Sequence, residues 1–166
     1  MVILFIFQMP MLNNIEEIIK IGKNNTETNK FLYTLSKTIY TKNFSNSCDN
    51  YFTNIELDKD KLKDFFTSFG IDYYKPFELD SGMKYLKKNK IFNIQNAYYY
   101  FISTQNIREI NYTLDSLSIT ISNLLLFQPE TFLLETFSHT NFYQINISNH
   151  FQWVLEKQPI VDWIEK

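Results

Sequence analysis

Glycine is scarce in this sequence: the 166 residues include only Gly22, Gly70 and Gly82. A dinucleotide-binding turn, a phosphate-binding loop and a nucleophile elbow each need clustered glycines, because the backbone must adopt positive φ angles or approach a ligand closely. The three glycines lie far apart along the chain. The sequence therefore excludes these glycine-dependent motifs.

Cysteine and histidine are as scarce as glycine. Cys48 is the only cysteine, so no intrachain disulfide can form, and a reducing intracellular compartment, either the cytoplasm or an organelle interior, is predicted. The two histidines, His139 and His150, stand outside any cluster of metal ligands. We therefore predict no metal and no nucleotide cofactor. The composition favours a non-catalytic protein, and an enzyme that uses Cys48 with one of the histidines is the alternative.

Arginine and alanine occur once each. Half of the chain consists of Phe, Tyr, Met, Ile, Asn and Lys, which are encoded by codons rich in A and T. The gene is therefore expected in a very AT-rich genome, such as that of a mitochondrion or another organelle, an intracellular parasite or symbiont, or a virus. A cleaved import leader is rich in arginine, so the single Arg108 argues against import and leaves synthesis inside an organelle open.

Long hydrophobic runs are also missing. No stretch approaches the roughly 18 apolar residues of a transmembrane helix, so no membrane span is predicted. The N-terminal segment is the most apolar one, and residues 1–12 are predicted to form an edge strand or an arm that inserts into a partner. Its six consecutive apolar residues are candidates for partner binding: Val2, Ile3, Leu4, Phe5, Ile6 and Phe7.

The net charge is small, but it is unevenly distributed. The formal charge of the chain is −2, so no overall field attracts it to nucleic acid or to an anionic membrane. Residues 1–108 carry +3 and residues 109–166 carry −5. The two parts could face different neighbours, although so few charges also vary in this way by chance.

Helical and strand patterns are interspersed along the chain. Helices are predicted over residues 13–21, 26–39, 58–69, 80–90, 93–104 and 149–164, with another starting at Pro129, and strands over 51–57, 71–74, 116–122 and 142–148. No repeat or linker interrupts them, so residues 1–166 are predicted to form a single domain. The order favours an α+β fold with a small, mostly antiparallel sheet, and an all-α bundle is the alternative.

Three of these predictions depend on particular residues. Gly22 is expected to end the first helix, which makes residues 13–39 a helical hairpin. Gly70 follows a stripe of buried apolar residues and is expected to end the helix over 58–69 in a left-handed conformation. Between residues 112 and 127 the strand and helix patterns conflict, and the β-branched Ile119, Thr120 and Ile121 favour a strand.

The most distinctive charged segment lies between residues 84 and 90. It contains four lysines and Tyr85, and it is followed by Phe92 and by the three tyrosines 98–100. Lysines contact phosphates and rings stack on unpaired bases, so the segment is typical of a single-strand RNA contact. The candidate residues are Lys84, Tyr85, Lys87, Lys88 and Lys90. A solvated charged face explains the same pattern.

Three functional hypotheses remain. The first is a non-catalytic structural or assembly subunit of a larger protein complex, which binds its partners through the N-terminal run and through Trp153 and Trp163 in the terminal helix. The second is an RNA-contacting subunit of a ribosome-like particle, through the segment from Lys84 to Lys90. The third is a viral or parasite effector that binds a host protein. We favour the first because no catalytic motif is present.

Overall fold

The computed structural model describes residues 15–35, 45–57, 59–80, 82–114, 117–126 and 128–165. The predicted N-terminal arm, Val2 to Phe7, lies outside these residues. In chain order the elements are α1 (Ile15–Leu35), α2 (Asn46–Leu57), α3 (Lys59–Phe69), β1 (Glu78–Leu79), β2 (Met83–Lys87), β3 (Lys90–Ser103), β4 (Ile110–Leu114), β5 (Leu117–Ser122), α4 (Thr131–Thr136), β6 (Asn141–Gln152) and β7 (Trp163–Ile164).

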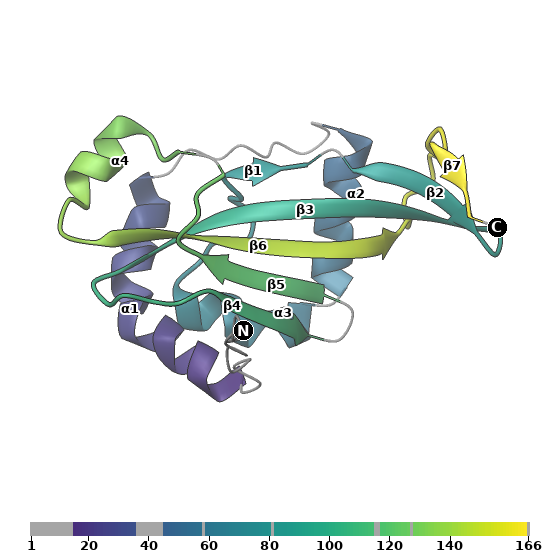
Figure 1. Cartoon of the computed structure of the whole chain (residues 1–166). Coiled ribbons are helices and arrows are strands. Elements are labelled where there is room, and N and C mark those ends of the chain that lie inside the picture. Colours follow the sequence, from purple (N-terminus) through teal and green to yellow (C-terminus); the bar gives the residue numbers. More distant parts are fainter. Residues whose placement is uncertain are drawn as a thin grey trace, which may run out of the picture.

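The strands form one seven-stranded sheet in the order β4-β5-β6-β3-β2-β7, with β1 paired to β3. All pairs are antiparallel except β2 and β7, which are parallel. Helices α1, α2 and α3 lie on one face of the sheet, and α4 lies at one end of it (Figure 1). The predicted α+β class with a mostly antiparallel sheet is confirmed, and the all-α alternative is wrong.

The centre of the sheet is the long antiparallel pair of β3 and β6. Their register runs from Phe92 opposite Gln152 to Ser103 opposite Asn141. Alternate residues of β3 face the helices, and Ala97, Tyr99 and Phe101 are fully buried there. The helix predicted over 93–104 is therefore wrong. The helical and the strand pattern both fit these residues, because apolar and aromatic side chains occupy both faces of the strand.

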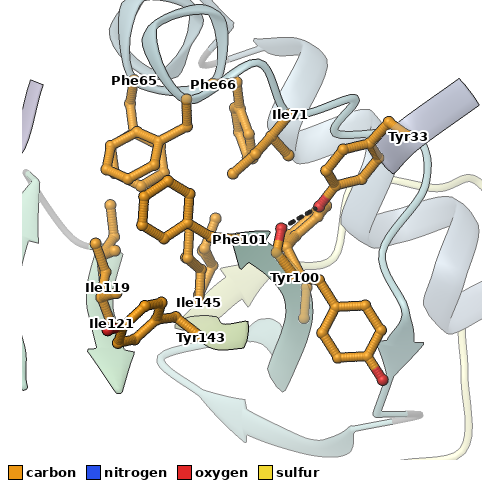
Figure 2. Packing of buried hydrophobic residues seen from close by; sticks show 14 of the residues in the cluster. Tyr33, Phe65, Phe66, Ile71, Tyr100, Phe101, Ile119, Ile121, Tyr143 and Ile145 are labelled. Carbon is orange, nitrogen blue, oxygen red and sulfur yellow. Dashed lines mark hydrogen bonds between the residues drawn. The ribbon is translucent and has the colours of Figure 1, made fainter. Parts of the chain in front are cut away.

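Aromatic rings fill the space between the sheet and the helices. Figure 2 shows Phe101 directed toward Phe65 and Phe66 of α3, while the side chain of Tyr100 points the other way. The ring of Phe101 packs edge-on against Phe69, with a centroid distance of 4.9 Å. Tyr33 of α1 donates a hydrogen bond from its hydroxyl to the Tyr100 carbonyl at 2.9 Å. These contacts hold α1 and α3 against the middle of the sheet.

Helix α1 continues through Gly22, so the predicted helical hairpin is wrong. A Cβ atom at residue 22 would lie 2.6 Å from the ring of Phe69. Glycine at this position therefore allows α1 to approach α3 closely, and the helix does not end there.

Residues 51–57 belong to helix α2, although the sequence predicts a strand there. The Ser45 hydroxyl accepts a hydrogen bond from the Cys48 amide at 3.1 Å and so caps the helix. Tyr51, Phe52 and Ile55 are buried on one face of α2, with helical spacing. The alternation of apolar residues at 51, 55 and 57 fits a strand only if Phe52, which is buried between them, is ignored.

Helix α3, strand β5 and the middle of β6 agree with the prediction. Gly70 follows α3 with φ 68°, as expected for a left-handed helix terminus. Leu117, Ile119 and Ile121 of β5 are buried and alternate with more exposed residues, which decides the conflict in favour of a strand. Helix α4 begins at Thr131 with Glu130 as its N-cap, so a helix is present where expected, but its predicted start at Pro129 is wrong by two residues.

Three further predicted elements are wrong. The helix predicted over 80–90 is replaced by β2 over Met83–Lys87 and by a turn into β3, in which Lys88 and Asn89 have positive φ angles. Residues 71–74 form a turn and not a strand. The terminal helix is absent from the described residues 149–165, because β6 continues through Gln152 and a loop leads to β7. Positive φ at two successive residues is typical of a tight hairpin turn, which excludes a helix through residue 90.

Candidate interaction surface at the C-terminal end of the sheet

The parallel pairing of β2 with β7 brings together two segments that the sequence analysis treats separately. Tyr85 lies opposite Trp163, and Leu86 lies opposite Ile164. The Lys84 amide donates a hydrogen bond of 2.5 Å to the Asp162 carboxylate, and the Asp162 amide donates one of 2.7 Å to the Lys84 carbonyl. The candidate RNA segment and the candidate partner-binding Trp163 therefore form one site (Figure 1).

Three rings stack across neighbouring strands at this site. Tyr85 is stacked on Trp163 with a centroid distance of 5.1 Å and an interplanar angle of 6°. On its other side it stacks on Phe92 of β3, at 5.5 Å and 23°. Both faces of the Tyr85 ring are thus covered, and only 6% of the residue is exposed. Trp163 ends the row and remains 37% exposed.

The row of rings continues into a larger surface on the sheet face opposite the helices. In the strand register, Met83 lies opposite Ile94, and Ile94 lies opposite His150. The His150 ring bonds to the Tyr85 hydroxyl through Nδ1, at 2.9 Å. We call this set the sheet-end surface, and its members are Met83, Tyr85, Phe92, Ile94, His150 and Trp163.

Each candidate lysine has a definite place around this surface. Lys87 forms an ion pair with Glu165, with 3.1 Å between Nζ and Oε1. Lys90 lies at the start of β3, where its Nζ is 3.5 Å from the Gln152 side-chain oxygen. Lys84 donates from Nζ to the Gly82 carbonyl at 3.0 Å. Lys88 is exposed in the hairpin turn.

The three tyrosines that follow the basic segment do not form a common surface. Tyr99 is fully buried, and its hydroxyl donates to the Tyr73 carbonyl at 2.8 Å. Tyr100 is also buried, and Tyr98 is half-buried. Burial is the first cause that raises the pKa of all three phenols. They serve chiefly as packing residues of β3.

Trp153, the other predicted partner-binding tryptophan, is buried. Its indole nitrogen donates to the Lys157 carbonyl at 3.0 Å, which holds the loop between β6 and β7. Only 6% of Trp153 is exposed. The structure therefore places Trp153 and Trp163 in different surroundings, and Trp163 is the one that a partner can reach.

The residues considered for catalysis are not brought together. Cys48 is buried in α2, and burial raises the pKa of its thiol, which makes a reactive thiolate less available. His139 is exposed after α4, which lies at the opposite end of the sheet from α2 (Figure 1). His150 lies on the sheet face opposite α2. Among the described residues no group of three or more His, Cys, Asp or Glu could hold a metal ion.

Comparison with known proteins adds no functional information. No family model matches the chain, and neither the curated proteins nor the solved structures with which it was compared include a match. Of the helices that the structure describes, none combines the length and the apolar character needed to cross a bilayer.

Sequence reasoning missed Met83, Ile94 and His150 as members of the surface. Met83 and Tyr85, like Phe92 and Ile94, are spaced two residues apart on either side of Lys88 and Asn89. This alternation around a two-residue turn is the signal of a hairpin, and it would have placed the four side chains on one face.

Proposed function

We propose that this chain is a non-catalytic subunit of a larger protein assembly and that it binds a partner protein through the sheet-end surface. The observation that supports this proposal is the exposure of Trp163 and Met83, 37% and 57%, beside a row of stacked rings at the edge of the sheet.

The composition of the surface fits a protein contact. Tryptophan, tyrosine and methionine are enriched in the centres of protein interfaces, and charged residues surround such centres. Here Lys87, Lys90 and Glu165 lie around the aromatic row. The row is held rigid by stacking and by the bond between His150 and Tyr85, so little conformational entropy is lost on binding.

The RNA hypothesis receives weaker support from the same residues. A base needs a free ring face for stacking, and both faces of Tyr85 are covered. The charge of Lys87 is balanced by Glu165. An effector that binds a host protein would use the same surface, and the identity of the partner distinguishes it from an assembly subunit.

The test is affinity capture of partners from cells of the organism of origin. We expect that Trp163→Ser and Met83→Ser each remove the same set of proteins from the captured fraction, while the matched change Leu57→Ser, at an exposed apolar residue of α2, retains it. Identical captured sets for the wild-type chain and both sheet-end variants would contradict the proposal. Capture of RNA that depends on Lys88 and Lys90 would favour the second hypothesis.

A further inference from the structure

We propose that two copies of this chain associate through strand β4, so that the sheet continues from one copy into the other. The sheet ends at β4 on one side and at β7 on the other. In Figure 1, β4 forms the lower border of the sheet. An edge strand presents backbone N–H and C=O groups with which another strand can pair. The inference goes beyond the proposed function, because the sheet-end surface lies toward the β7 edge.

The backbone groups of Asn111 and Thr113 are directed toward the β4 edge. Only two residues separate Leu114 from Leu117, and these leucines lie opposite each other in the β4–β5 hairpin. The closing pair of such a hairpin shares two hydrogen bonds, and the following pairs alternate between non-bonded and bonded. Asn111 and Thr113 belong to the non-bonded pairs, so their N–H and C=O groups point away from β5. Among the residues that the structure describes, no other element donates to or accepts from these groups.

Strand β4 lacks the features that normally protect an edge. Proteins discourage pairing at an edge with charged side chains, proline, bulges or very short strands. Residues Ile110–Leu114 contain neither a charge nor a proline, and their pairing with β5 has no bulge. The edge at β7 differs, because β7 has only two residues and is flanked by Asp162 and Glu165. Association by strand pairing is therefore favoured at β4.

The side chains of β4 leave its backbone edge open. Asn111 accepts a hydrogen bond from the Thr120 hydroxyl at 2.8 Å and donates one to the Glu109 carboxylate at 3.1 Å. These bonds hold the Asn111 side chain over β4 and β5. On the helix side, Tyr112 and Leu114 are half-buried against the core, and an added strand would cover their remaining exposed parts.

A second copy of β4 fits these groups. In a two-fold antiparallel pair both strands offer the same groups, so residues with outward-directed backbone groups must lie opposite each other. A two-fold axis at Asn111 places Glu109 opposite Thr113 of the other copy and opposes no like charges. An axis at Tyr112 would place Glu109 opposite residue 115, an aspartate, and like charges directly opposite each other destabilise a strand pair. An axis at Thr113 would leave Glu109 without a partner. The pairing is therefore centred on Asn111.

The first test is the oligomeric state of the full chain, measured by sedimentation equilibrium. We expect a reversible dimer with a micromolar Kd, because pairing one short strand buries less surface than a standard interface. Asn111→Lys should raise this Kd by at least about tenfold, since the two-fold axis brings the two lysines opposite each other. Ser118→Lys is the matched control, because this exposed residue lies on β5 and not at the edge. Its Kd should equal that of the parent.

The second test locates the axis with single cysteines in a Cys48→Ala background, where no other cysteine is present. Asn111→Cys should form a covalent dimer on oxidation, because residues opposite each other have Cα atoms about 5.5 Å apart, within the range of a disulfide. Thr113→Cys is the control on the same strand. In the assigned register its two copies are displaced by about 13 Å along the strands, so it should not form a covalent dimer.

Three results would overturn the proposal. They are a parent chain that stays monomeric, a dimer that Asn111→Lys does not weaken, and equal crosslinking of Asn111→Cys and Thr113→Cys. An intrachain disulfide in the double variant Ile6→Cys, Asn111→Cys would assign the edge to the N-terminal segment and would also overturn it. Circular dichroism and urea unfolding show whether each variant is folded, and if Asn111→Lys is not, the cysteine variants decide.

Discussion

The two ends of the long β3–β6 pair are built from the same two strands but are packed differently. At the end near α4, both sheet faces are covered, and Phe101 and Ile102 on opposite faces are fully buried. At the end near β7, only the face toward α2 is covered: Asn93 is fully buried, whereas Phe92 is half-buried and His150 is exposed. We call these the covered end and the free end.

The difference separates residues that hold the fold from residues that can contact a partner. At the covered end a side chain is surrounded by other parts of the chain, so its removal leaves a cavity. At the free end both ring faces of Tyr85 are covered, but Trp163, which ends the aromatic row, packs on one face only. Substitutions at the two ends should therefore differ in whether they reduce the free energy of unfolding or reduce binding.

The largest effect is expected for Phe101→Ala at the covered end. Phe101 is 0% exposed and contacts Phe69 and Tyr143. The free energy of unfolding should fall by about 3–5 kcal/mol, because the substitution removes buried surface and leaves a cavity. Urea unfolding followed by circular dichroism measures it. A loss below about 1 kcal/mol would show that the two ends are not packed differently.

The second largest loss of stability is expected at the contact between α1 and α3. Gly70 has φ 68°, and a Cβ atom there would lie 2.2 Å from the Thr26 carbonyl oxygen. Gly70→Ala should therefore destabilise the protein by at least about 1 kcal/mol, since it adds both backbone strain and a clash with the α1 backbone. Thermal unfolding tests this, with Gly82→Ala as a comparison at the free end. Unchanged stability of Gly70→Ala would be inconsistent with this close helix contact.

Alkaline pH should destabilise the protein through its buried tyrosines. Burial raises the pKa of Tyr33, Tyr51 and Tyr99 above the ordinary value of 10.0. The folded state thus holds these protons more tightly than the unfolded state, so stability is complete below pH 10 and declines as the pH rises above it, by up to about 1.4 kcal/mol per pH unit for each tyrosine.

Urea unfolding between pH 8 and pH 11 measures this decline. Tyr51→Phe should make it shallower, because it removes one titrating group. The same variant loses the hydrogen bond of 3.0 Å between the Tyr51 and Tyr99 hydroxyls, so its stability at pH 8 should fall by about 1 kcal/mol. A free energy of unfolding that stays constant between pH 8 and pH 11 would contradict the inference that burial raises the pKa of these tyrosines.

The smallest effect on stability is expected for Trp163→Ala at the free end. Trp163 packs on one face only, against Tyr85, and is 37% exposed. The free energy of unfolding should fall by less than for Phe101→Ala, because the ring stays partly in water and no closed cavity is left, and the lost aromatic pair contributes only about 0.5–1.5 kcal/mol beyond its buried area. A loss as large as that of Phe101→Ala would place Trp163 in the core and remove the support for the sheet-end surface.

Local signals predicted the elements whose stabilising contacts are near in sequence. Helix α3 has an apolar stripe followed by Gly70, and α4 follows Pro129, so their boundaries are encoded within a few residues. The strand over 116–122 was favoured by β-branched residues. The wrong predictions concern long segments rich in Ile, Phe, Tyr and Asn, in which apolar residues recur often enough to fit both the helical and the strand period.

The sequence by itself excluded glycine-dependent motifs and an intrachain disulfide, because composition is sufficient for these, and it favoured the α+β class over an all-α bundle. Only the tertiary structure decided that β3 pairs with β6 along its whole length, since the two strands are about 50 residues apart in sequence. It alone placed Trp163 on Tyr85 and separated it from Trp153. The β2–β7 and β3–β6 pairings join residues that are distant in sequence, so no local pattern specifies that Trp163 and His150 meet the β2–β3 hairpin in the sheet-end surface.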